Sequence, residues 1–113
     1  IFPIMHVIVI RREVYEANRW IAQSLYKAFL KAQQLCYEDL SENVVLKSML
    51  PWLNSNVEEV CTEMGEDFWP YGVERTHQTL STLLRYSREQ GLTTSIMEPQ
   101  DLFASETLEA FKI

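Results

Sequence analysis

The chain has 113 residues, of which 47% are apolar, and its formal net charge is −6. This length suits one small domain with enough apolar material for a core. An excess of acidic side chains argues against nucleic acid and anionic membranes as partners, because both attract clustered Lys and Arg. The apolar run at residues 1–10 is about half of the ~20 residues that cross a bilayer.

Cys36 and Cys61 are the two cysteines of the chain, and no Cys-x-x-Cys spacing occurs. Small secreted domains that depend on disulfides use more cysteines than this. We therefore predict two reduced thiols in a cytoplasmic protein. A disulfide between the two residues remains an alternative.

The first segment predicts a β-strand at about residues 5–11. Val7, Ile8, Val9 and Ile10 are all β-branched and show no alternation with polar residues, as in strands that are buried on both faces. No second strand is visible downstream. Either the chain is the carboxy-terminal part of a larger α/β protein, or two copies form a homodimer through this strand.

A long helix is predicted at about residues 19–39. Its apolar residues recur at spacings of three and four, which places them on one stripe of the helix. The stripe consists of Trp20, Ile21, Leu25, Ala28, Phe29, Ala32, Leu35 and Cys36. Polar residues such as Lys27 and Lys31 fall largely on the other side.

Further helices are predicted at about residues 43–50, 56–64, 73–90 and 99–104. Ser55 and Glu58 have the spacing of a capping box at the start of one helix, and Gly65 and Gly91 suit helix ends. The fold class expected from the residues is therefore mainly α with one apolar β-strand, in a single segment over residues 1–113.

Four stretches together resemble a known family. They are "FPIMHVIVIRREVYEANRWIAQSLYKAFLKAQ", "LPWL", "MGEDFWPYGVERTHQTLSTLLRYSREQGL" and "LFASETLE", and they resemble the carboxy-terminal third of the 4,5-dihydroxyphthalate decarboxylase family. The resemblance implies a two-lobed α/β fold of the type 2 periplasmic-binding kind, with a ligand cleft between the lobes. It further implies that this chain is a carboxy-terminal portion of such a fold.

The resemblance directs attention to three cationic or titratable residues. His6 is the candidate general acid, because imidazole exchanges a proton near neutral pH. A histidine hydrogen-bonded to backbone at a strand start is the alternative. Arg11 and Arg12 are weaker candidates for bidentate contacts to a substrate carboxylate, and solvated charges at a strand end are their alternative. Decarboxylation of this kind does not strictly require a metal, and no metal or cofactor is predicted.

The aromatic residues Trp52, Phe68, Trp69 and Tyr71 either stack on an aromatic ligand or anchor a loop against the core.

Three functions are compatible with these features. The resemblance favours part of a cytoplasmic lyase that removes CO2 from 4,5-dihydroxyphthalate or a similar aromatic acid by ring protonation. The first alternative is a binding protein that holds a small organic acid without turnover, because one architecture hosts both roles. The second is a helical interaction domain that dimerises through its strand.

Overall fold

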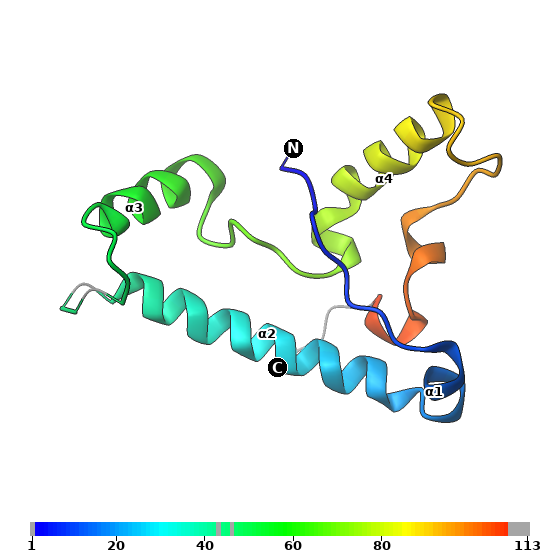
Figure 1. The fold of residues 1–113 in the computed structure, drawn as a ribbon, viewed down its shortest axis with the longest axis horizontal. Coiled ribbons are helices and arrows are strands. Elements are labelled where there is room, and N and C mark those ends of the chain that lie inside the picture. The colour runs from blue at the N-terminus through cyan, green and yellow to red at the C-terminus, as the bar shows by residue number, and fades with distance from the viewer. Residues whose placement is uncertain (1, 43, 46, 109–113) are drawn as a thin grey trace. The chain divides into compact units, whose positions relative to one another are not determined.

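In the part of the chain that the structure describes, the regular elements are helices (Figure 1). The computed structural model describes residues 2–42, 44–45 and 47–108. In chain order the elements are α1 (Arg12–Ala17), α2 (Trp20–Ser41), α3 (Leu53–Met64), α4 (Val73–Glu89) and two 3₁₀ helices, η1 (Pro99–Leu102) and η2 (Ser105–Thr107). The predicted mainly α character is therefore confirmed for the part of the chain that the structure describes.

The predicted β-strand at residues 5–11 is wrong. Residues 2–10 run without helical turns or strand pairing, and α1 begins directly afterwards at Arg12 (Figure 1). A strand exists only through the backbone hydrogen bonds of a neighbouring strand, and the described residues provide none. They form no sheet, so the α/β architecture expected for this chain is absent from them as well.

The helix predicted at residues 43–50 also differs from the structure. Residues 43 and 46 lie outside the described residues, and the neighbours 44–45 and 47–49 form bends instead of helical turns. The next helix, α3, begins at Leu53 and has Trp52 in the capping position. Ser55 therefore lies inside the first turn, and its predicted role as a helix cap is wrong.

Two compact units make up the chain. The first, here called the terminal unit, consists of the described residues of Ile1–Tyr26 and Tyr71–Ile113. Its buried side chains are Ala22 on α2, Val73 and Leu80 on α4, and Pro99 on η1. Val73 and Leu80 are seven residues apart, so they lie on the same face of α4, and α4 packs against η1.

A reciprocal capping arrangement shapes η1 in the terminal unit. The Asp101 carboxylate accepts a hydrogen bond from the Glu98 backbone N–H at 2.9 Å, and the Glu98 side chain accepts one from the Asp101 backbone. Pro99 occupies the first position of η1, where its missing N–H costs nothing because that amide has no partner within a helix.

The second unit, here called the middle unit, is Lys27–Pro70, and its organising residue is Tyr37 on α2. The Tyr37 hydroxyl donates to Asp67 at 3.2 Å and accepts from the Trp69 backbone N–H at 3.0 Å. The Tyr37 ring lies 4.9 Å from that of Phe68, centroid to centroid. Polar contacts thus hold residues 67–69 on the helix, and no described side chain of this unit is fully buried.

The predicted apolar stripe of α2 is largely uncovered. Leu25, Phe29 and Leu35 are 37%, 39% and 51% exposed. The half-buried face of α2 carries Tyr26 and Tyr37 instead, and this face lies roughly a quarter turn away at 100° per residue. Hydrogen bonds of these tyrosine hydroxyls, the contact of the Tyr37 ring with Phe68 and the buried Ala22 all lie on this side of α2.

None of the helices in the described ranges combines the length and the apolar character that are needed to cross a bilayer.

Candidate functional site

The three residues predicted for the site all lie at exposed positions. His6 is in the segment before α1, Arg11 precedes that helix and Arg12 is its first residue. Arg12 is 3.8 Å from the Glu16 carboxylate, and both side chains are more than half exposed, so this ion pair contributes little to stability. Among the described residues, no hydrogen bond or ion pair joins His6 to either arginine or to another titratable group.

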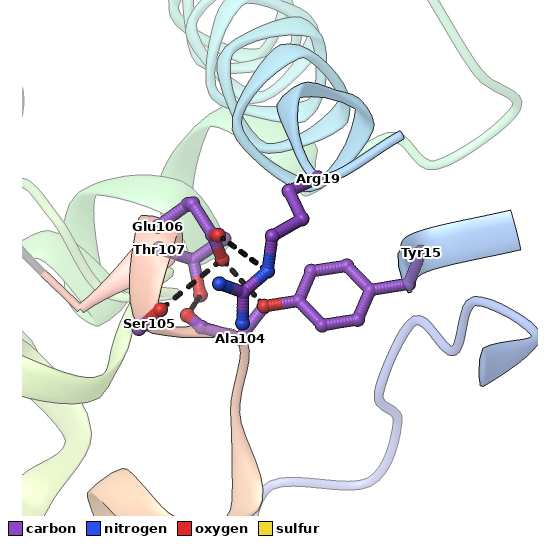
Figure 2. A network of polar contacts seen from close by, with 6 residues as sticks. All are labelled: Tyr15, Arg19, Ala104, Ser105, Glu106 and Thr107. Atoms are coloured by element: carbon purple, nitrogen blue, oxygen red, sulfur yellow. Dashed lines mark hydrogen bonds and ion pairs between the residues drawn. The ribbon is translucent and has the colours of Figure 1, made fainter. Parts of the chain in front are cut away.

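A polar cluster that the sequence did not predict surrounds Glu106 (Figure 2). One carboxylate oxygen accepts a hydrogen bond from the Tyr15 hydroxyl at 2.6 Å and a longer one from the Ser105 hydroxyl at 3.3 Å. The other oxygen is 3.3 Å from Nε of Arg19. We call these four residues the Glu106 cluster.

Local structure presents these side chains to one another. Tyr15 lies on α1, which ends at Ala17 with Asn18 in the capping position. Arg19 follows and lies beside the Tyr15 ring, with its guanidinium carbon 5.3 Å from the ring centroid. Glu106 lies on η2, where the Thr107 hydroxyl donates a hydrogen bond to the Ala104 carbonyl at 2.7 Å. Figure 2 shows the Glu106 side chain reaching from η2 toward both partners.

The cluster keeps the Glu106 carboxyl ionised. The hydrogen bond from Tyr15 is the main cause that lowers its pKa, followed by a bond from its own backbone, while partial burial acts in the opposite direction. Arg19 and Ser105 lower the pKa further. An ionised carboxylate accepts hydrogen bonds, and Glu106 accepts them from Tyr15 and Ser105, so it links η2 to α1 within the terminal unit.

Sequence patterns carried no signal for this cluster, because Tyr15 and Glu106 are 91 positions apart. The aromatic residues Phe68 and Trp69 lie in the loop that follows α3. Phe68 packs on Tyr37, and Trp69 is held through its backbone N–H and through its carbonyl, which accepts a hydrogen bond from Gln33. The Phe68 ring and the Trp69 backbone therefore hold this loop to α2, whereas Trp69 and Trp52 themselves are 41% and 74% exposed.

A hollow in the terminal unit lies beside the start of α4. Tyr26, Tyr71, Arg75 and Leu108 are among its lining residues, and its volume is about 250 Å³ including space open to solvent. The space in it that a water molecule can occupy is about 30 Å³, whereas pockets for small ligands usually span ~300–1,000 Å³. The hollow is therefore too small for a ligand of that size. Within the described part of the chain, no group of three or more His, Cys, Asp or Glu side chains lies close enough to hold a metal ion.

Comparison with known proteins gives one informative similarity. No protein-family model matches the chain. The chain is 31% identical over all of its 113 residues to 4,5-dihydroxyphthalate decarboxylase of Comamonas testosteroni. These residues cover 34% of that protein, so the chain spans about a third of the length of this relative. The resemblance seen in the sequence is supported as similarity to a part of the decarboxylase.

Proposed function

We propose that this chain is part of an enzyme that removes CO2 from a hydroxylated aromatic acid. The supporting observation is the 31% identity to 4,5-dihydroxyphthalate decarboxylase, which extends over the whole chain. Similarity along the full length makes a match through a single common helix pattern an inadequate explanation.

The proposed reaction has a simple balance. A proton first adds to the ring carbon that bears the departing carboxylate, using an electron pair of the ring. The bond between this carbon and the carboxylate then breaks, CO2 leaves, and the electron pair of that bond returns to the ring and restores its aromaticity, so each turnover consumes one proton. Ring hydroxyl groups assist because they help to push electron density toward the carbon that is protonated.

We assign the proton donor of this reaction to His6. Its imidazole is exposed, so it is accessible to a substrate or to further polypeptide that completes a site. Arg11 and Arg12 follow closely and are also exposed. In the proposal their guanidinium groups bind the carboxylate that stays on the ring, since planar guanidinium matches carboxylate geometry.

The deciding experiment uses the natural polypeptide that contains this chain, because these residues correspond to only about a third of the relative. The purified protein is incubated with 4,5-dihydroxyphthalate and with a panel of hydroxylated aromatic acids, and released CO2 is measured. We expect turnover of at least one member. A protein that binds these acids without releasing CO2 is a binding protein, and this outcome would falsify the enzymatic proposal.

The role of His6 is tested with His6→Ala in the same polypeptide. Loss of a general acid typically lowers kcat about 10²–10⁴-fold. The matched control is His77→Ala, because His77 is an exposed histidine on α4 whose ring contacts Ser81. We expect this control to keep its activity. Near-normal turnover by His6→Ala would remove His6 from the mechanism and leave the proposed reaction class intact.

A further inference from the structure

The uncovered apolar stripe of α2 is a feature that the proposed function leaves unexplained. Trp20, Leu25, Phe29 and Leu35 are 66%, 37%, 39% and 51% exposed. The exposed Cys36 lies on the same stripe, because it follows Phe29 by seven residues, or about two turns. Contiguous apolar patches of more than a few hundred Å² are uncommon on monomeric proteins and mark interaction surfaces.

The other face of α2 is already in use within the chain. Tyr26 donates a hydrogen bond to the Tyr71 carbonyl at 3.5 Å, and Tyr37 holds residues 67–69. A helix whose apolar residues extend beyond one contact face is typical of helices that pack on more than one side. Two sides of α2 are therefore suited to packing, and the described residues cover one of them.

A second apolar surface in the same chain is uncovered too. Met5, Val7, Ile8 and Val9 are between 59% and 83% exposed. Residues 4–10 contain one polar side chain, that of His6. Two separate surfaces, on α2 and on the segment before α1, thus lack the apolar cover that side chains of this kind normally have.

We propose that further polypeptide packs on the α2 stripe, and that it corresponds to the part of the decarboxylase relative that this chain does not match. That part amounts to about two thirds of the relative, which is ample to cover both surfaces. The occupant presents an apolar face to Leu25, Phe29 and Leu35. The test of this packing does not use CO2 release, so its outcome is distinguishable from the outcome of the test of the proposed function.

A second copy of the chain is the alternative occupant. A two-fold symmetric interface uses the same patch on each copy, so in that case cover of the stripe would depend on the protein concentration.

Cys36 provides a probe of the stripe that needs no substitution. The natural polypeptide that contains this chain is treated with iodoacetamide, and alkylation of Cys36 is followed by mass spectrometry in the native state and in guanidinium. We expect native alkylation to be slower by about 100-fold or more, because reaction of a covered thiol requires local opening. Alkylation of Cys61, which is half-buried on α3, is measured in the same digest.

The matched control is Gln78→Cys. Gln78 is exposed on α4 and lies on the opposite side of the helix from Val73 and Leu80, so we expect its thiol to react rapidly in the native protein. Light scattering on the same sample gives the number of copies. Rapid native alkylation of Cys36 would overturn the proposal. Slow alkylation that becomes fast on dilution of a dimer would also overturn it and would assign the stripe to a second copy.

Discussion

The Glu106 carboxylate joins residues from both ends of the sequence within the terminal unit. Its two oxygens contact the Tyr15 hydroxyl and Arg19 Nε, and the carboxylate side chain is 24% exposed. Because the carboxyl pKa is lowered in the folded chain, ionised Glu106 favours the folded state above the ordinary pKa of a glutamate, about 4.3. This contribution is lost as the pH falls through the lowered value.

The residue-scale prediction is that Tyr15→Phe raises the pKa of Glu106. The substitution keeps the ring and removes the hydroxyl whose hydrogen bond is the main cause of the lowered pKa. The titration is followed by carbon-13 NMR of the Glu106 carboxyl. Arg19→Gln is the matched control, and we expect a smaller rise because Arg19 is a lesser cause. A pKa that is unchanged in Tyr15→Phe would contradict the hydrogen bond as its determinant.

At the scale of elements, two glycines set where helices end and begin. Gly65 follows α3 with φ +89° and ψ 171°, and Gly72 precedes α4 with φ +96° and ψ 156°. Both conformations belong to a region that is essentially restricted to glycine. They differ in surroundings, because a Cβ at Gly65 would meet nothing within 4 Å, whereas one at Gly72 would meet the hydroxyl of Tyr26.

This difference predicts an order of stability for two matched variants. Gly65→Ala carries backbone strain alone, which costs about 1–3 kcal/mol. Gly72→Ala adds displacement of the Tyr26 hydroxyl and weakens its hydrogen bond to the Tyr71 carbonyl, so we expect it to be the more destabilising. Urea unfolding of both variants under the same conditions measures the difference. Equal loss of stability would show that Tyr26 moves aside without cost.

The elements also show where sequence reasoning succeeds and where it stops. The prediction that Gly65 ends a helix is confirmed. It could be made from the sequence because a positive φ depends on the residue type at that one position. The start of α3 was misplaced, since Ser55 has the residue type of a cap and yet lies within the helix. The sequence pattern also misses the covered face of α2, because the contacts of that face are made with residues 67–71. No local periodicity contains those contacts.

At the scale of the whole molecule, the apolar segment before α1 limits what the sequence alone could predict. Its β-branched residues led to a strand, but residues 2–10 have no strand partner in the described part of the chain. The composition indicates that such a segment packs against other apolar residues. Whether its backbone forms a strand depends on the polypeptide around it. The Glu106 cluster could not be predicted from the sequence for a related reason, because Tyr15 and Glu106 lie 91 positions apart.

The homodimer predicted through residues 5–11 yields the last prediction. In the 113-residue chain on its own, Val7, Ile8 and Val9 are 60%, 64% and 83% exposed, so we expect copies to associate through this segment as concentration rises. Val9→Asp places a charge in the contact and forfeits burial of a valine, worth about 1.5–3 kcal/mol. Sedimentation velocity should therefore show a dissociation constant that is higher by about tenfold or more.

Val44→Asp is the matched control for this measurement. Val44 is 87% exposed and lies outside the segment, so the same change of side chain there should leave association unaltered. If both variants weaken association equally, the loss comes from added negative charge on an already acidic chain and not from the contact. A folded chain that stays monomeric at high concentration would exclude pairing through residues 5–11 altogether. The apolar segment would then need a different polypeptide to cover it, as proposed for the α2 stripe.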